Sequence, residues 1–330
     1  MHYIGSKEKL LPFLTKEIFK HIDEPLHVRN FCDLFAGTGI VGRCFADEGL
    51  HVMSNDIEYY SYIINHAYLL TRSLHEYDNQ LHELNALMPR EGLIFNYYAM
   101  GGGEERRYFS DENAKKIDAM RQEIELWYCS GVIDKERYYL LLATLLESVT
   151  YISNTASIYS AFLKTLKKTA QMPLILKALH VKENSASHKV YHSDANKIIQ
   201  EISGDILYLD PPYNLRQYGA NYHILNTIAK YQSFEPRGKT GLPKYYSSPF
   251  SRQKSAYESL ENLLKNAQFD TIFLSYSSDG IISRQEIEKL MQSLGEYHYV
   301  SQEHKRFNAK HTKDTHHKTM EYLHVLKKNL

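Results

Sequence analysis

An acid, two prolines and an aromatic residue stand together in the chain as Asp210-Pro211-Pro212-Tyr213. The largely apolar run 205–209 precedes them and is typical of a buried parallel strand, which the prolines end because they cannot continue a hydrogen-bonded ladder. This order places an acid at the carboxyl end of a strand, where open α/β sheets bind their ligands. An aromatic ring follows on a backbone that two fixed φ angles stiffen.

One chemistry that uses an acid, rigid carbonyls and an exposed ring is alkylation of the exocyclic amine of a nucleobase. That nitrogen is a poor nucleophile because its lone pair is delocalised into the ring. Asp210 and the Pro211 carbonyl can each accept one N–H and so favour the pyramidal nitrogen of the transition state. Tyr213 can stack on a base flipped out of a helix. The alternative is an ordinary strand-end turn, and the residue types favour the chemical interpretation.

A glycine-rich turn lies far upstream of this motif. A predicted strand over 28–35 leads through Ala36-Gly37-Thr38-Gly39 into an amphipathic helix, the first half of a nucleotide-binding unit. A second strand over 51–55 ends at Asp56, 17 residues beyond Gly39, where an acid can accept hydrogen bonds from ribose hydroxyls. Gly42 holds the third position of the dinucleotide pattern, so spacing alone leaves NAD open as a ligand. The Asp-Pro-Pro-Tyr motif counts against NAD.

Three further stretches carry candidate site residues, each with a plain structural alternative. Lys7 begins a helical pattern and either holds a ligand carboxylate or is solvated. Asp194 ends a predicted strand over 189–192 and either suits the adenine amino group of a cofactor or caps a helix. The small polar segment 154–164, around Tyr159, either lines a channel for a base or packs as a helix edge. The second interpretation of that segment is slightly favoured.

The remaining pattern indicates an α/β sheet interrupted by a helical block. Further strands are predicted over 271–275, 297–301 and 320–326. Helices are predicted over 57–88, 110–130 with Ser110 as N-cap, 136–149 and up to Tyr231, with a glycine-rich break over 92–103. We therefore expect residues 1–71 and 189–330 to form the catalytic domain and residues 72–188 to form a mainly helical insertion.

Composition bounds the class of protein. With 330 residues and 43% hydrophobic side chains, the chain is long enough for about two domains with a sizeable core. It has no apolar run approaching about 18 residues and no signal peptide pattern at its start. Its three cysteines are far apart in the sequence. These features predict a soluble cytoplasmic protein with reduced thiols, without disulfides or zinc.

Charge is balanced overall, with 39 Lys plus Arg against 39 Asp plus Glu, so global charge does not indicate a nucleic-acid partner. Two stretches are basic: 304–328 has seven Lys or Arg against two acids, and 164–189 has six Lys against one acid, a net charge of +5 in each. Such stretches suit phosphate contacts, although solvated surface is the commoner explanation. The loop with His311, His316 and His317 lacks carboxylate or thiol partners at ligand spacing, so no metal is expected.

These motifs resemble those of adenine-specific DNA methyltransferases that use S-adenosylmethionine. Asp210-Pro211-Pro212-Tyr213, preceded by Phe35-Ala36-Gly37-Thr38-Gly39, is the motif pair of that family. The order of cofactor half, insertion and catalytic half resembles the alpha arrangement of the Dam type. The segments that look like FokI-type modification methylases are Tyr3 to Lys7, Asn154 to Lys164, Asp210 to His223 and Phe273 to Ser277. The similarity extends over nearly the whole chain.

The resemblance implies a Rossmann-like sheet and direct in-line methyl transfer from S-adenosylmethionine to the N6 amine of a flipped adenine, with no metal. Lys7 would contact the methionine carboxylate of the cofactor, Asp56 its ribose and Asp194 its adenine. Asp210 and Tyr213, with Pro211 and Pro212, would handle the target adenine. Further cofactor contacts are expected at Tyr3, Phe35, Ala36, Gly37, Thr38, Gly39, Ile57 and Asp210. DNA contacts are expected at Asn154, Tyr159, Lys164, Arg216, Tyr218 and Tyr222.

The expected partner is duplex DNA, whose major groove the insertion would read. By this interpretation the chain is the modification half of a restriction-modification pair, with a cognate restriction endonuclease and no membrane. Within the class, cytosine-N4 or RNA adenine methylation is the alternative. Outside it, the alternatives are a nicotinamide-dependent oxidoreductase and a non-catalytic nucleic-acid-binding module.

Overall fold

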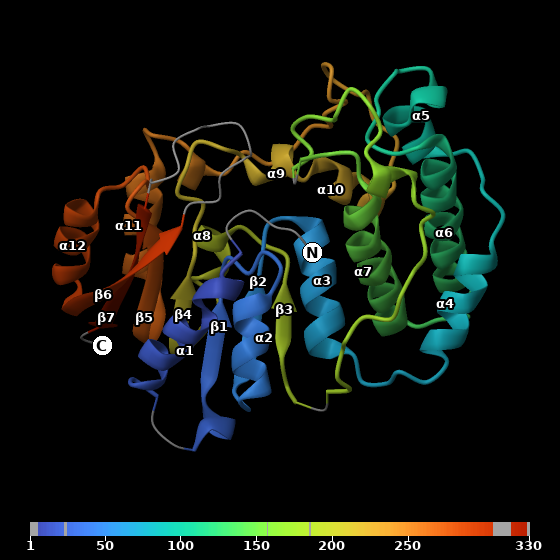
Figure 1. Ribbon diagram of the computed structural model, residues 1–330. Helices are drawn as coiled ribbons and strands as arrows, with labels where there is room; N and C mark the ends of the chain where they lie inside the picture. Colours follow the sequence, from blue (N-terminus) through green and yellow to red (C-terminus); the bar gives the residue numbers. More distant parts are fainter. Residues whose placement is uncertain (1–5, 23–24, 157, 185, 306–317, 329–330) are drawn as a thin grey trace. The chain divides into compact units, whose positions relative to one another are not determined.

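The computed structural model of the chain describes residues 6–22, 25–156, 158–184, 186–305 and 318–328. Contacts divide these residues into two compact units, whose helices and strands are labelled in Figure 1. The sheet unit consists of Gly5–Ile57, Ala186–Gln217 and Tyr246–Leu330. The helical unit consists mainly of Glu58–Ser185 and Tyr218–Tyr245.

The sheet unit is built on a sheet that has seven strands among the described residues. The strands are β1 (Asn30–Asp33), β2 (His51–Asn55), β3 (Lys189–Tyr191), β4 (Ser203–Leu209), β5 (Gln268–Ser277), β6 (Gly295–Lys305) and β7 (Lys318–Lys328). They lie in the order β3-β2-β1-β4-β5-β7-β6. Strands β1 to β5 pair in parallel, whereas β7 runs antiparallel to β5 and β6. The strand order reverses between β1 and β4, which is where doubly wound sheets bind ligands.

Apolar side chains bury both faces of the central strands, which explains why the second half of β4, residues 206–209, is continuously hydrophobic. On one face, Phe31 of β1 stacks on Phe45 of a helix at 4.0 Å between ring centroids. On the other face, Leu207 and Leu209 of β4 share a core with Leu260. The α-helices of this unit are α1 (Leu11–Phe19), α2 (Ile40–Asp47), α8 (Ala195–Ile198), α11 (Ala256–Asn266) and α12 (Arg284–Gln292). Its 3₁₀ helices are η1 (Glu8–Leu10), η2 (Leu26–Val28) and η5 (Pro249–Ser251).

The helical unit packs its helices around a separate core that is rich in tyrosine and leucine. Its α-helices are α3 (Tyr59–Leu70), α4 (Tyr77–Ala86), α5 (Leu93–Tyr98), α6 (Asp111–Cys129), α7 (Lys135–Ile152), α9 (Tyr218–Asn221) and α10 (His223–Lys230). Its 3₁₀ helices are η3 (Met100–Gly102) and η4 (Lys168–Gln171). No helix in the described part of the chain is long and apolar enough to cross a membrane.

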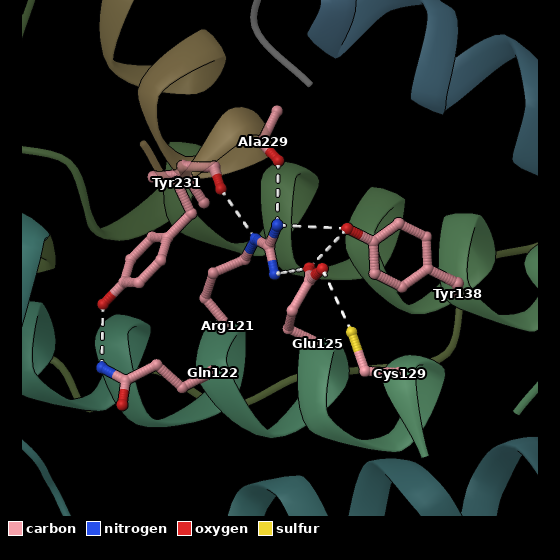
Figure 2. Close-up of polar contacts among 8 residues, drawn as sticks. Arg121, Gln122, Glu125, Cys129, Tyr138, Ala229 and Tyr231 are labelled. Atoms are coloured by element: carbon pink, nitrogen blue, oxygen red, sulfur yellow. Dashed lines mark hydrogen bonds and ion pairs between the residues drawn. The ribbon is translucent and has the colours of Figure 1, made fainter. Parts of the chain in front are cut away.

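A buried arginine joins α10 to α6 and α7. The guanidinium of Arg121 donates to the backbone carbonyls of Ile228 and Ala229 at 3.0 and 3.2 Å, and to the hydroxyl of Tyr138 at 3.1 Å. It also forms an ion pair with Glu125 at 2.6 Å (Figure 2). The carbonyls at the end of α10 are those that a helix leaves unpaired. This network explains why residues 218–245, which follow the strand-end motif, belong to the helical unit.

The division into units differs from the domain boundaries expected from the sequence. Residues 58–71 lie in the helical unit, because α3 packs on α7 through Tyr62 and Tyr139, whose rings meet edge to face at 5.4 Å. The N–H of Tyr60 also donates to Asn226 of α10 at 3.1 Å. The spacing of apolar residues in the sequence predicts a helix and its apolar face, but it does not show which core that face packs against.

Local predictions fared unevenly. β2 has the predicted bounds, and Ser110 caps α6 by accepting the N–H of Asn113 at 3.3 Å. The single helix predicted over 57–88 is wrong, because two helices, α3 and α4, are separated by residues 71–76. The predicted break over 92–103 contains α5, whose first N–H groups bond to the carboxylate of Asp118. This acid, distant in sequence, replaces a local capping residue.

Candidate active site

The glycine turn after β1 is held by the strands on both sides. The N–H of Leu34 donates to the carbonyl of Tyr208 on β4 at 3.2 Å, and the N–H of Ala36 donates to the carbonyl of Asn55 on β2 at 3.0 Å. Gly37 and Gly39 have φ angles of 53° and 73°, which glycine adopts without the steric cost that other residues meet. The turn therefore leads directly from the strand into α2, as predicted.

Two acids support this turn. Asp33, the last residue of β1, is buried and accepts the N–H of Gly42 in the first turn of α2 at 3.1 Å. Asp56 accepts the N–H of Gly37 at 2.8 Å. Burial raises the pKa of Asp33 to about 7; the bond from Gly42 opposes this rise, and the charges of Asp210 and Asp56 add to it. The turn thus lies among several carboxyl groups.

Asp210, directly after β4, forms a largely buried ion pair. Its Oδ1 lies 2.8 Å from the Nζ of Lys7, which is itself only 4% exposed. The same Nζ lies 3.2 Å from Oε1 of Glu321 on β7. Burial raises the pKa of Asp210 to about 6, and the charge of Lys7 opposes that rise. Burial lowers the pKa of Lys7, but the charges of Asp210 and Glu321 outweigh it and raise the pKa well above its usual value.

The ring of Tyr213 lies beside this ion pair. The Nζ of Lys7 is 5.7 Å from its centroid, a cation–π contact, and the ring of Tyr276 meets it edge to face at 6.0 Å. The carbonyl of Tyr213 accepts the N–H of Ile281 at 2.9 Å, which fixes the backbone that carries the ring. Four residues after β4 therefore hold a carboxylate, a rigid backbone and a partly exposed aromatic face together.

The carboxyl ends of β2 and β3 complete the site. The side chain of Asn55 donates to the carbonyls of Leu34 and Ser193, each at 3.1 Å, and accepts the N–H of Ser193 at 3.1 Å. Asp194 caps α8 through Oδ1, which accepts the N–H of Asn196 at 2.9 Å. The other oxygen of Asp194 accepts a hydrogen bond from the hydroxyl of Tyr246. The capping alternative for Asp194 is therefore present in the structure, alongside an aromatic neighbour.

The predicted DNA-contacting residues fall into two groups. Lys164 and Arg216 are exposed, and Tyr218 is half-buried. Asn154, Tyr159 and Tyr222 are at most 2% exposed. The side chain of Asn154 donates to the carbonyls of Arg107 and Leu163 at 2.8 and 3.1 Å and accepts the N–H of Lys167 at 3.0 Å. In this conformation Asn154 holds the loop that carries Lys164; a direct contact with DNA stays a prediction.

Three residues of the site were not predicted from the sequence. Asn55 stands next to the predicted Asp56, and Asp33 lies near the end of the predicted first strand over 28–35, so their positions were a signal. Glu321 is the one acid of β7, whose centre is mainly apolar, which was a weaker signal. Tyr3 and the histidines at 311, 316 and 317 lie outside the described residues. Within those residues, no group of three or more His, Cys, Asp or Glu side chains is placed to hold a metal ion, and the expectation of no metal stays a prediction.

The doubly wound sheet, the glycine turn and the acidic strand tip together define a Rossmann-like methyltransferase. Comparisons with known proteins agree. The sequence model of the family described as "D12 class N6 adenine-specific DNA methyltransferase" matches residues 3–290. The chain is 49% identical to the type II methyltransferase M.NlaIII of Neisseria lactamica, over 99% of each chain.

Two further relatives show the same similarity. The type II methyltransferase M.CviAII of Paramecium bursaria Chlorella virus 1 is 35% identical over 93% of this chain and 92% of its own length. The type II methyltransferase M.FokI of Planomicrobium okeanokoites is 36% identical over the whole of this chain, which spans 53% of that larger protein. The chain therefore belongs to the D12 class of N6 adenine-specific DNA methyltransferases. This membership decides against the nicotinamide-dependent oxidoreductase that the glycine spacing had left open.

Proposed function

We propose that the ends of β1, β2 and β4 form the site at which this enzyme moves a methyl group from S-adenosylmethionine to the N6 amine of an adenine flipped out of duplex DNA. The observation that supports this most is the pairing of β1 with β4. It brings the glycine turn, Asp210 and Tyr213 to one edge of the sheet, at the reversal of strand order. We expect one small cofactor to bridge them.

The charge of the site suits S-adenosylmethionine, which carries a sulfonium, an ammonium and one carboxylate. Asp33, Asp56, Asp210 and Glu321 supply acids, and Lys7 is a buried cation among them. An ammonium has three donors; Lys7 donates one hydrogen bond to Asp210 and forms an ion pair with Glu321, so donor capacity is left for the cofactor carboxylate. The backbone from Phe35 through Ala36, Gly37, Thr38 and Gly39 would hold the methionine part.

The nucleoside part of the cofactor would lie at the ends of β2 and β3. Asp56 would accept hydrogen bonds from the ribose hydroxyls, and Ile57 would pack beside it. Asp194 would accept a hydrogen bond from the cofactor adenine, sharing the oxygen that Tyr246 now binds. Tyr3 is proposed as a further contact from the sequence resemblance alone.

The target amine would be held by the strand tip. Asp210 Oδ2 and the Pro211 carbonyl accept its two N–H groups, and Pro212 keeps that backbone rigid while Tyr213 stacks on the base. These acceptors favour the pyramidal nitrogen whose lone pair attacks the methyl carbon. When bound, the cofactor supplies a methyl group on a sulfonium; the N–C bond forms as the S–C bond breaks. The alkylated nitrogen then loses one proton to Asp210 or to water.

Cationic and aromatic residues outside the strand tip would bind the DNA. Lys164 and Arg216 are proposed for phosphates, and Tyr218 for stacking on a base of the DNA. Asn154, Tyr159 and Tyr222 would act through the loops they support. Because the relatives above are named type II methyltransferases, we also propose that the chain protects DNA in a restriction-modification system with a cognate endonuclease. The cytoplasmic location stays a prediction.

The experiment is methyl incorporation from labelled S-adenosylmethionine into duplex DNA, followed by digestion to nucleosides. We expect label in N6-methyladenine with the wild-type enzyme and none with Asp210→Ala. The control is Asp270→Ala, which removes an exposed acid of β5 and should leave incorporation unchanged. Label in N4-methylcytosine, or incorporation into RNA but not DNA, would support those alternatives instead. No incorporation into any duplex would contradict the proposal.

A further inference from the structure

A third side chain takes part in the buried ion pair of the strand tip. Lys7 Nζ lies between Asp210 Oδ1, at 2.8 Å, and Glu321 Oε1, at 3.2 Å. Glu321 is 5% exposed and comes from β7, whereas Asp210 follows β4; β5 separates these two strands in the sheet. One partly buried and one buried carboxylate thus share one ammonium.

The carboxylate of Glu321 is itself fixed. The hydroxyl of Ser275 on β5 donates to Glu321 Oε1 at 2.6 Å, and Ser275 is fully buried. Ser275 lies opposite Leu323, so it is the diagonal neighbour of Glu321 on the same face of the antiparallel pair. The register of β5 and β7 therefore decides where the second carboxylate stands and, through it, where the ammonium of Lys7 stands.

A buried charge with this arrangement is costly, because each carboxylate and the ammonium lose their hydration. A lysine needs one acid to be neutralised, and Asp210 alone would do that. Glu321 adds a negative charge that the ion pair does not require. Glu321 attracts Lys7, so the ammonium is not bound to Asp210 alone. Without Glu321, Lys7 would compete with an incoming amine for the oxygens of Asp210.

We propose that Glu321 is a positioning residue for methyl transfer: it holds Lys7 so that the ammonium binds one oxygen of Asp210 and leaves the other to the target amine. This inference rests on the proposed function of the strand tip. Among the described residues, Asp210 Oδ2 has no hydrogen-bond partner, and the Asp210 side chain keeps 17% of its surface exposed. An amine can therefore reach that oxygen while Lys7 stays in place.

The charges that face Asp210 support the same role. The titratable groups around the ion pair are Lys7, Asp33, Tyr208, Tyr213 and Glu321. Burial raises the pKa of Asp210, Lys7 lowers it and Glu321 raises it. Without the charge of Glu321, the pKa of Asp210 falls, and Lys7 becomes a partner of Asp210 alone.

The test is Glu321→Gln, which removes the charge, keeps the size and can still accept the bond from Ser275. The pH dependence of kcat is measured with saturating cofactor and DNA. We expect kcat on the plateau to fall by about tenfold, which is less than the roughly 10²- to 10⁴-fold that a general acid or base itself contributes. We expect the acid limb, where Asp210 takes up a proton, to move to lower pH. A residue that merely ties β7 to the rest of the unit would lower the melting temperature and leave that limb where it was.

Two companion variants keep the test decisive. Glu296→Gln makes the same change at an exposed acid of β6 and should leave kcat and the limb unchanged. Ser275→Ala loosens the carboxylate but keeps its charge, so kcat should fall by less than in Glu321→Gln, with the limb in place. If Glu321→Gln does not fold, Ser275→Ala decides. Wild-type kcat in Ser275→Ala, or an unmoved limb in a folded Glu321→Gln, would overturn the inference. Methyl incorporation by the wild-type enzyme is measured first. If it is present, either of these results contradicts the role of Glu321 and not the proposed function.

Discussion

The N–H of Gly37 donates to Oδ2 of Asp56 at 2.8 Å, which binds the turn after β1 to the acid that follows β2. With Leu34 bonded to Tyr208, the same turn is also tied to β4. We therefore expect a ligand that touches the glycine turn to reach Asp56, the proposed ribose acid, and Asp210. Disturbing the turn should weaken cofactor binding before it affects chemistry.

We therefore expect Gly39→Ala to lower affinity for S-adenosylmethionine. Alanine at a φ of 73° costs about 1–2 kcal/mol, and the turn must shift to relieve it. The matched control is Gly49→Ala, at a φ of 97° and with nothing within 4 Å of the added carbon, outside the site. Both variants should lose stability, but only Gly39→Ala should lose the rise in melting temperature that the cofactor gives by mass action. Equal rises in the two variants would argue against a cofactor at this turn.

The second prediction concerns the aromatic ring of the strand tip. The ring of Tyr213 faces Lys7 and Tyr276, and stacking on a base needs its face but not its hydroxyl. We expect Tyr213→Ala to reduce kcat/KM by about 10- to 100-fold, the equivalent of about 1–3 kcal/mol of stacking, and Tyr213→Phe to keep most activity. The measurement is steady-state methylation of duplex DNA. An equal loss in both variants would assign the effect to the hydroxyl.

How much of this site could be read from the sequence depends on the range of each interaction. Gly37, Gly39, Asp56 and Asp210 end or follow apolar strands, and that local pattern predicted the sheet edge where the structure has them. Lys7 was expected to serve a cofactor carboxylate alone, but it also pairs with Asp210 and Glu321. Its two partners come from strands more than 200 and 300 residues away in sequence, and no local pattern shows such a pairing.

The helical unit shows the same limit. Ser110 caps α6 through a bond three residues away, which local sequence predicts well. Residues 58–71 and 218–245 join that unit through Tyr139 and Arg121, contacts that depend on how helices pack. Periodicity predicts a helix and its buried face, but the partner of that face is decided by the whole core. The expected domain boundaries differ from the observed units for this reason.

Stability should depend on pH through Asp33. Burial raises the pKa of this carboxyl from 3.8 in the unfolded chain to about 7 in the folded one, so the folded state holds its proton more tightly. The raised pKa of Asp33 stabilises the folded state in full below about pH 4. This stabilisation falls as the pH rises from about 4 to about 7, and it is gone above about pH 7. Asp33→Asn keeps an acceptor for Gly42 and should remove this slope. Urea unfolding at pH 5 and pH 8 measures it; an unchanged difference between the two pH values would contradict the prediction.

The last prediction separates a residue that would touch DNA from one that supports it. Lys164 is exposed on the loop that the buried Asn154 holds through Arg107, Leu163 and Lys167. If Lys164 neutralises one phosphate, Lys164→Gln should lower the slope of log K against log salt by about 1, because one counterion fewer is released. Asn154→Ala should also weaken DNA binding, and it should in addition destabilise the fold by about 1–3 kcal/mol, since buried donors and acceptors lose their partners.

The control for both is Lys289→Gln, an exposed lysine on α12 of the sheet unit, where the slope should not change. Binding is measured by fluorescence anisotropy of a labelled duplex over a range of salt concentrations, and stability by urea unfolding. A slope that stays at the wild-type value in Lys164→Gln would remove this loop from the DNA-binding surface. If Asn154→Ala loses stability but keeps its DNA affinity, the loop that Asn154 supports is not needed for DNA binding. That result would contradict the proposed contact.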